Sequence, residues 1–299
     1  MDELGQTRSR FLALYDRLKH EIMHDADIEF TEEMRLQVEE ILDYNVPRGK
    51  LNRGLAVIHT YQALKGDELS EEEFFLASML GWSLEWVGLN AINHAILLKT
   101  HIHRIIKRYF REMPYYLELI ELCDEVAYQT SMGQMLDLVI THEGKKDLAK
   151  YTMQAYRRIV IFKTSYYSFY LPIACALLLA GVELEKFKGI KEILVEMGVY
   201  FQVQDDYLDC FGDPEVAGKI GTDIEDYKCS WLIENYGKSD PTSVEKIKNV
   251  YRELDIQGLF SKYEVEIYEN LLSAIEAQSS SVMQEILKAL LEKIYQRKK

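Results

Sequence analysis

Apolar residues recur every three or four positions along most of the chain, and polar or charged residues fill the positions between them. This spacing is typical of helices that bury one face. Prolines and clusters of glycine, proline and serine are rare, so little turn chemistry is available for many short strands. The pattern therefore predicts an all-α protein. The predicted helical segments are 8–23, 31–45, 70–82, 114–140, 151–171, 191–211 and 279–299.

Two of these helices have recognisable starts. Thr31 is followed by two glutamates, and Ser70 stands three residues before Glu73, which is the spacing of a capping box. The segment 166–182 is the most apolar of the chain, but it is shorter than a bilayer span and contains Pro172. We therefore expect a buried helix there and no membrane insertion.

The stretch from Ser70 to Arg111 is unusually long for one globular helix. It contains no proline, and glycine interrupts it only at Gly81 and Gly88. Two arrangements remain open. Either the stretch forms one continuous helix in place of two, or two helices are joined after local rearrangement because a segment that once separated them is absent.

Composition narrows the class of protein. The chain has 299 residues, of which 48% are apolar, so we expect a single domain over residues 1–299. The formal net charge of −14 argues against a nucleic-acid-binding face. The four cysteines lie far apart without a Cys-x-x-Cys pair, which indicates neither a zinc site nor a disulfide framework. Because the first residues also lack the apolar core of a signal peptide, we expect a cytoplasmic protein.

Three aspartates lie together in one predicted helix. Asp205 and Asp209 are one helical turn apart and Asp206 is beside them, so their charges repel each other. Mg²⁺ would offset this repulsion, since it binds carboxylates and completes its shell with phosphate oxygens. Apolar and aromatic residues flank the three aspartates, so we expect them to line a cavity. The alternative is a solvated acidic face, as expected for the similar patterns at 39–43 and 67–71.

Basic residues on both sides of this motif suit an anion. Lys219 and Lys228 follow the aspartates and supply the point charges that phosphate binding needs. Gly49, Lys50 and Arg53 form a second basic element near the start of the chain, which suits another anion. The alternative for this element is an ordinary basic turn.

Residues 201–231 resemble the second aspartate-rich region of eukaryotic farnesyl diphosphate synthases. Further segments that resemble signatures of these enzymes are 42–54, 129–138, 157–172 and 293–299. The chain is thereby identified as a member of the isoprenyl diphosphate synthase family. The resemblance implies an isoprenoid-synthase-like bundle of roughly ten antiparallel helices around a central cavity, here shortened by one helix. It also implies a homodimer, with neither nucleic acid nor membrane as a partner.

The same resemblance implies head-to-tail condensation of isopentenyl diphosphate with dimethylallyl and geranyl diphosphate to give farnesyl diphosphate. The cofactor implied is Mg²⁺, or Mn²⁺ in its place. The implied metal ligands are Asp205, Asp206, Asp209 and Asp223. The positions implied to contact the allylic diphosphate or to stabilise the developing carbocation are Lys163, Thr164, Gln202, Lys219 and Lys228.

Other matching positions concern the second substrate and the cavity. Those implied to bind isopentenyl diphosphate are Gly49, Lys50 and Arg53, with a basic tail of Arg297, Lys298 and Lys299 that closes over it. Gln134 and Asp137 match an inward-facing pair near the metal ions. Tyr167 and Phe169 are expected to line an apolar cavity, with plain core packing as the alternative.

The chain departs from the family in one important segment. No DDxxD precedes Asp205, although family members carry a first such motif on a facing helix. The residues up to Trp86 resemble the start of that helix, and those from Val87 resemble a segment well beyond it. About thirty residues, or most of a long helix, are therefore missing, and a smaller shortening is implied within 229–240. Three functions remain open: an active synthase, a catalytically impaired member that binds diphosphate or modulates an active partner, and a structural helical protein.

Overall fold

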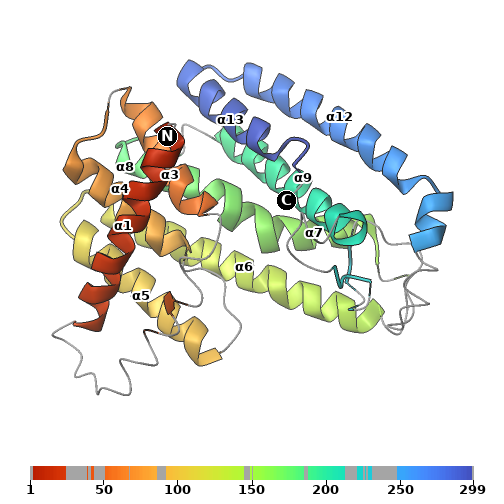
Figure 1. The fold of residues 1–299 in the computed structure, drawn as a ribbon, viewed down its shortest axis with the longest axis horizontal. Coiled ribbons are helices and arrows are strands. Elements are labelled where there is room, and N and C mark those ends of the chain that lie inside the picture. Colours follow the sequence, from red (N-terminus) through yellow and green to blue (C-terminus); the bar gives the residue numbers. More distant parts are fainter. Residues whose placement is uncertain are drawn as a thin grey trace. The chain divides into compact units, whose positions relative to one another are not determined.

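The computed structural model describes residues 3–24, 39, 42–43, 51–66, 68–85, 92–144, 149, 151–184, 188–212, 221–224, 226, 228–230 and 248–297. These residues contain helices and no β-strand, which confirms the all-α prediction (Figure 1). The helices are α1 (Glu3–Met23), α3 (Asn52–Lys65), α4 (Glu71–Glu85), α5 (Ile92–Phe110), α6 (Tyr116–Gly144), α7 (Met153–Val160), η2 (Ile161–Tyr170), α8 (Leu171–Leu179), α9 (Lys188–Phe211), α12 (Ile256–Glu276) and α13 (Ser281–Ile294).

The chain divides into two compact units, which are described separately. Unit 1 comprises Met1–Asp124 and Leu171–Lys186, and unit 2 comprises Glu125–Tyr170 and Phe187–Lys299. One boundary falls inside α6 and another falls between η2 and α8, so neither is a polar linker of the kind that separates independent domains. The expectation of one domain over residues 1–299 stays a prediction.

Unit 1 is built around Trp82 of α4. Its ring is fully buried and stacks on Phe11 of α1, with the ring centroids 4.2 Å apart. Its Nε1 donates a hydrogen bond to the Phe11 carbonyl oxygen at 3.1 Å, so the one polar atom of the indole is satisfied. Around this contact, α3 packs against α4 and α8, and α4 packs against α1 and α5.

The helix α8 carries the most apolar segment of the chain. All nine of its residues are buried, and the chain leaves the helix through Gly181, whose φ of 69° is left-handed. This confirms a buried helix within 166–182, although the residues up to Tyr170 belong to η2. Over the described ranges, no helix is long and apolar enough to cross a membrane.

The predicted start of α4 is confirmed. The Glu73 amide donates to Ser70 Oγ at 3.2 Å and the Ser70 amide donates to Glu73 Oε2 at 3.0 Å, which closes the capping box. Between Ser70 and Arg111 the structure has two helices, α4 and α5, which pack against each other. Residues 86–91 between them lie outside the described residues, as does most of the helix predicted at 31–45.

In unit 2, α9 packs against η2, α7, α12 and α13 (Figure 1). Two glycines allow neighbouring backbones to approach η2 closely. A Cβ atom at Gly198 of α9 would lie 2.5 Å from the Cα of Ser165. A Cβ atom at Gly133 of α6 would lie 2.3 Å from the backbone nitrogen of Lys163. Both distances are shorter than van der Waals contact, so only glycine fits. Consequently, α6 and α9 meet η2 at the residues on either side of Thr164 in the sequence.

The helix η2 corrects the prediction of a regular helix over 151–171. It is a π-helix of 10 residues that follows α7 directly and precedes α8. Such segments are rare and occur frequently at functional sites. The helices α3 and α12 lie outside the predicted segments. Phe260 of α12 stacks on Tyr207 of α9 with the centroids 3.9 Å apart, which fixes α12 against α9.

The variant Gly198→Ala tests the close approach of α9 and η2. We expect it to lower the free energy of unfolding by about 1–3 kcal/mol, because the added methyl group overlaps the Ser165 backbone. The control is Gly189→Ala in the same helix, where the nearest atom, in the Gln278 side chain, would be 3.6 Å away. This control should be neutral or stabilising by up to about 1 kcal/mol. Urea unfolding measures both, and equal stability of the two variants would contradict the packing.

Candidate active site

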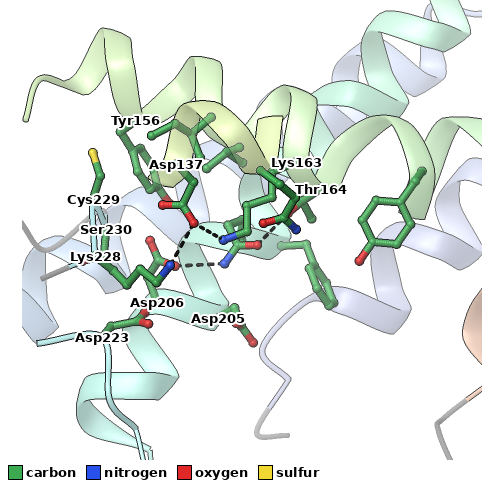
Figure 2. A pocket seen from close by; sticks show the side chains of 16 residues that line it. Asp137, Tyr156, Lys163, Thr164, Asp205, Asp206, Asp223, Lys228, Cys229 and Ser230 are labelled. Carbon is green, nitrogen blue, oxygen red and sulfur yellow. Dashed lines mark hydrogen bonds and ion pairs between the residues drawn. The ribbon is translucent and has the colours of Figure 1, made fainter. Parts of the chain in front are cut away.

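A cavity of about 270 Å³ lies in unit 2, among α6, α7, η2, α9 and the segment 221–230 (Figure 2). The predicted site residues that line it are Gln134, Asp137, Lys163, Thr164, Gln202, Asp205, Asp206, Asp223 and Lys228. Tyr167 also lines it, as expected from the sequence, and the remaining lining residues are Tyr156, Ile159, Val160, Phe201, Cys229 and Ser230. Residues from widely separated parts of the sequence therefore share one cavity. Phe169 packs edge-on against Phe201 behind this wall, at 5.4 Å between centroids.

Asp137 of α6 is the most buried carboxylate of the cavity, with 2% of the residue exposed. Its Oδ2 accepts hydrogen bonds from Lys163 Nζ at 2.8 Å and from Lys228 Nζ at 3.1 Å (Figure 2). Burial alone would raise the pKa of Asp137, but the two ammonium groups outweigh burial and hold the pKa below its ordinary value. Asp137 is therefore ionised and fixes both lysines at the cavity wall.

The backbone explains why Asp137 meets Lys163. Asp137 lies one helical turn after Gly133, so both residues occupy the same face of α6. Gly133 is where the backbone of α6 touches η2 at Lys163. The close approach of two backbones thus brings the carboxylate and the ammonium group together.

A second set of hydrogen bonds joins η2 to α9. Thr164 Oγ1 donates to Gln202 Oε1 at 2.8 Å, and Gln202 Nε2 donates to Asp206 Oδ1 at 3.0 Å. Because the amide of Gln202 is used at both ends, its orientation is fixed. Asp206 is only 4% exposed, and its carboxylate is held by a neutral donor, the Gln202 amide.

Asp205 lies next to Arg297, near the end of the chain. Arg297 Nη2 is 3.5 Å from Asp205 Oδ1, and the same guanidinium donates to Gln204 Oε1 at 3.0 Å and to the Phe201 carbonyl at 3.2 Å. It also covers the Phe201 ring at 3.7 Å from the centroid, which is a cation–π contact. Burial lowers the pKa of Arg297, and the charge of Asp205 opposes that shift. These contacts anchor the end of the described chain on α9.

A buried hydrogen-bond network supports Arg297 from behind. Gln204 Nε2 donates to the Tyr200 hydroxyl at 2.8 Å and to Glu264 Oε1 at 2.7 Å, and the Tyr200 hydroxyl donates to the same Glu264 oxygen at 2.7 Å. Burial raises the pKa of Tyr200, and its bond to Glu264 raises it further. Glu264 of α12 thus fixes the amide of Gln204, whose oxygen is turned toward Arg297.

Asp209, in the last turn of α9, contacts Asp223 in the segment that follows this helix. The Asp223 backbone amide donates to Asp209 Oδ2 at 2.9 Å. Asp205, Asp206 and Asp223 line the cavity, whereas Asp209 does not. The sequence placed Asp205 and Asp209 on one helical face, but in the structure Asp209 holds the segment that presents Asp223.

Six predicted residues lie elsewhere. Five of them are outside the described residues: Gly49, Lys50, Lys219, Lys298 and Lys299. Arg53 belongs to unit 1, where its Nη2 pairs with Glu85 Oε2 at 3.1 Å and the Glu85 side chain is 6% exposed. The binding roles expected for these six residues stay predictions.

Sequence reasoning missed several residues of the cavity, among them Tyr156 and Cys229. Burial, and then the charges of Asp137 and Asp206, raises the pKa of Cys229 to about 12. Its thiol is therefore protonated and is no nucleophile. Tyr156 precedes Lys163 by seven residues, which is two helical turns, so the helical period could have placed both on the same face.

The chemistry of the cavity fits a divalent cation. Its lining residues contribute four carboxylates but two ammonium groups, and carboxylate oxygens are the ligands that Mg²⁺ prefers. In the part of the chain that the structure describes, no three His, Cys, Asp or Glu side chains are arranged as a metal site. The carboxylates of Asp206 and Asp209 instead accept the hydrogen bonds given above. The ligand set expected from the sequence stays a prediction.

Comparison with known proteins decides the family. The model of the polyprenyl synthetase family matches residues 86–259. Farnesyl pyrophosphate synthase 2 of Arabidopsis thaliana is 50% identical over 342 positions, which cover 99% of this chain and 100% of that protein. The chain belongs to the polyprenyl synthetase family. The farnesyl pyrophosphate synthase of Panax ginseng is similar to the same extent, at 50% identity over 99% of this chain and 100% of that protein, which confirms the resemblance to the eukaryotic farnesyl type.

Solved structures support the same family assignment. Farnesyl diphosphate synthase of T. brucei complexed with risedronate matches with a TM-score of 0.88 at 27% identity, and the same enzyme complexed with minodronate matches with a TM-score of 0.89 at 26% identity. Each match covers 98% of this chain and 100% of the other. The isoprenoid-synthase-like fold is thereby confirmed.

This chain is shorter than the relatives it matches. The alignment with the Arabidopsis thaliana protein spans 342 positions against 299 residues here, so at least 43 positions hold no residue of this chain. The difference agrees with the shortening expected from the sequence. The sequence contains no DDxxD before Asp205.

The charge of Asp137 makes the stability of the folded chain depend on pH. The pKa of Asp137 is lower in the folded chain than the value of about 3.9 in an unfolded one, so its contribution is complete above that pH and is lost as pH falls through the folded pKa. We expect Asp137→Asn to be less stable than the wild type by a constant margin above about pH 5. The margin should narrow below about pH 4. Urea unfolding at several pH values measures it, and a margin that does not change with pH would contradict the pairing.

Proposed function

We propose that the chain binds an allylic prenyl diphosphate in the cavity of unit 2 and condenses it with isopentenyl diphosphate. The substrates are dimethylallyl and then geranyl diphosphate, and the product is farnesyl diphosphate. The observation that carries this proposal is the cavity of four carboxylates and two lysines, in a chain 50% identical to farnesyl pyrophosphate synthases.

Charge supports a metal-dependent reaction. A diphosphate brings negative charge into a cavity whose carboxylates already outnumber its ammonium groups. We propose that Asp205, Asp206 and Asp223 hold Mg²⁺, or Mn²⁺, with Asp209 as a further ligand. When bound, the cation acts as a Lewis acid that stabilises the leaving diphosphate.

The neighbouring cations and donors bind the same diphosphate. Lys163 and Lys228 lie at hydrogen-bonding distance from Asp137, and we propose that both donate to diphosphate oxygens while Asp137 keeps them in place. Thr164 and Gln202 are held together by their hydrogen bond and add neutral polar groups near Asp206. Lys219 is proposed to add a third ammonium group.

The carbon–carbon bond-forming steps then need an apolar part of the cavity from which water is excluded. The allylic carbon–oxygen bond breaks with its electrons on the diphosphate, the isopentenyl double bond attacks the allylic carbon, and a proton is lost to the released diphosphate. Phe201 and Tyr167 line the cavity, and Phe169 packs against Phe201. These rings would keep water from quenching the cation. Gly49, Lys50, Arg53, Gln134 and Arg297 are proposed to serve the substrates, as the resemblance implies.

A second candidate function is diphosphate binding without turnover, alone or as a modulator of an active partner. It is favoured by the absence of a DDxxD before Asp205 and by the positions of the relatives that have no counterpart here. Fewer carboxylates hold fewer cations, so the leaving group is less stabilised. A loss of about 4 kcal/mol would slow ionisation about a thousandfold.

The binding and turnover experiments separate the two candidates. Purified chain is titrated with pyrophosphate at saturating Mg²⁺ by calorimetry, and is incubated with both labelled five-carbon diphosphates to detect longer prenyl products. We expect Asp205→Ala to lower pyrophosphate affinity about 10-fold or more, because it removes a proposed metal ligand. Glu269→Ala, which removes an exposed carboxylate of α12, should bind as the wild type does.

The outcomes differ for each candidate. Products above the level of Asp205→Ala support the synthase. Metal-dependent binding without such products supports the second candidate and contradicts the first. A wild-type chain that gives no heat with pyrophosphate contradicts both.

We also propose that the chain forms a homodimer through α6. Tyr128, Met132, Met135 and Val139 are spaced four, three and four residues apart, so they form one face of the helix. Their exposed fractions are 62%, 37%, 50% and 45%, which is unusual for large apolar side chains. A self-complementary stripe of this kind suits a second copy of α6 related by a twofold axis.

The variant Met135→Glu tests this surface. A buried carboxylate at the dimer interface should shift the chain toward the monomer, because burying an unpaired charge is costly. Met153→Glu is the control, since Met153 is also exposed, at 59%, but lies on α7 and not in the stripe on α6. Sedimentation equilibrium measures both. Equal dimerisation of the two variants would contradict the assignment of the α6 face.

The cytoplasm stays our prediction for the location of the chain. Its four cysteines are free and buried, as suits a reducing compartment. One similar relative, farnesyl pyrophosphate synthase 1 of Arabidopsis thaliana, is named mitochondrial. Fractionation of the native protein would distinguish the two compartments.

A further inference from the structure

The hydroxyl of Tyr156 is buried at the cavity wall and makes no hydrogen bond of normal geometry within the described part of the chain. The residue is 3% exposed, and its ring packs in an apolar cluster that includes Ile159, Val203 and Cys229. An unpaired buried hydroxyl costs about 1–3 kcal/mol. Packing of the ring accounts for the burial of Tyr156 but not for its hydroxyl group, which a phenylalanine would lack.

Tyr156 and Asp206 line the same cavity, and a phenol is a donor for which a carboxylate is an acceptor. Burial raises the pKa of Tyr156 well above its ordinary value, and the charge of the nearby Asp206 raises it further. Asp206 already accepts one hydrogen bond at Oδ1, from Gln202.

A tyrosine with a purely structural role looks different in the same unit. Tyr200 is also fully buried, but its hydroxyl donates to Glu264 at 2.7 Å and accepts from Gln204 at 2.8 Å. Its polar atom is satisfied without any ligand. Tyr156 lines the cavity instead, together with Asp206 of the aspartate motif, and its buried hydroxyl has no such partner among the described residues.

We propose that Tyr156 is a positioning residue whose hydroxyl orients Asp206 for binding a divalent cation and its diphosphate. This inference rests on the proposed function. Carboxylates that ligate metals are held by hydrogen bonds from neighbouring side chains, and loss of such a partner typically costs about 10–100-fold in metal affinity. Hydrogen bonds of this kind are often poorly aligned before the ligand binds. Tyr156 from α7 and Gln202 from α9 would then hold Asp206 together.

The variant Tyr156→Phe keeps the ring and removes the hydroxyl. The purified full chain is titrated with Mn²⁺ and inorganic pyrophosphate in calorimetry, and its stability is measured by urea unfolding. We expect the affinity to fall about 10-fold or more, with an unchanged or higher unfolding midpoint, because no well-formed hydrogen bond is lost. Tyr109→Phe in unit 1, whose hydroxyl donates to Glu21, is the control and should show the reverse pattern.

A double variant with Asp206→Asn tests whether Tyr156 acts through Asp206. In that background Tyr156→Phe should cause no further loss of affinity, because the group it orients is already neutral. The proposal is overturned if the single variant binds as tightly as the wild type, or if the loss is equally large in the Asp206→Asn background. In both cases the proposed function survives. If the wild-type chain itself binds no manganese and pyrophosphate, the proposed function fails and this inference fails with it.

Discussion

One buried carboxylate organises the cavity of this member of the polyprenyl synthetase family. Asp137 is almost completely removed from water, and an unpaired charge in that position would cost several kcal/mol. Lys163 and Lys228 compensate it by bonding to the same oxygen. The three charges therefore depend on each other, and through them α6, η2 and the segment 228–230 are tied together. The two cations that suit a diphosphate are in place because Asp137 is ionised between them.

That arrangement depends in turn on how closely three backbones approach each other. Gly133 lets α6 touch η2 at Lys163, and Gly198 lets α9 touch η2 at Ser165, so the two contacts lie on either side of Thr164 in the sequence. The π-helical geometry of η2 changes the angular spacing of its side chains from that of an α-helix. A larger residue at Gly133 would separate α6 from η2 and lengthen the Lys163–Asp137 bond, and one at Gly198 would separate α9 from η2 and lengthen the Thr164–Gln202 bond.

The sequence predicted features that depend on local patterns. The capping box at Ser70 and Glu73 and the buried helix α8 follow from spacing and apolarity, and both are confirmed. Long-range partners could not be predicted in the same way. The contact between Gln204 and Glu264 joins residues 60 positions apart, and nothing local shows that this glutamate of α12 is buried. Tyr156 was missed because its ring belongs to the core pattern while its hydroxyl belongs to the cavity.

The same charges explain why binding and turnover can separate in this chain. The lining residues include four carboxylates and two ammonium groups, so the cavity has a net charge of −2. One divalent cation at Asp205 and Asp206 would neutralise that charge and leave none to offset a bound diphosphate. Breaking the allylic bond leaves further negative charge on the diphosphate, which needs additional positive charge in the same place. The guanidinium of Arg297 is bonded to Gln204, Phe201 and Asp205, so it would have to leave partners on α9 before it could bind a substrate. We therefore propose that the carboxylates of α9 can hold a metal diphosphate, whereas turnover requires further positive charge, such as the third ammonium group proposed for Lys219.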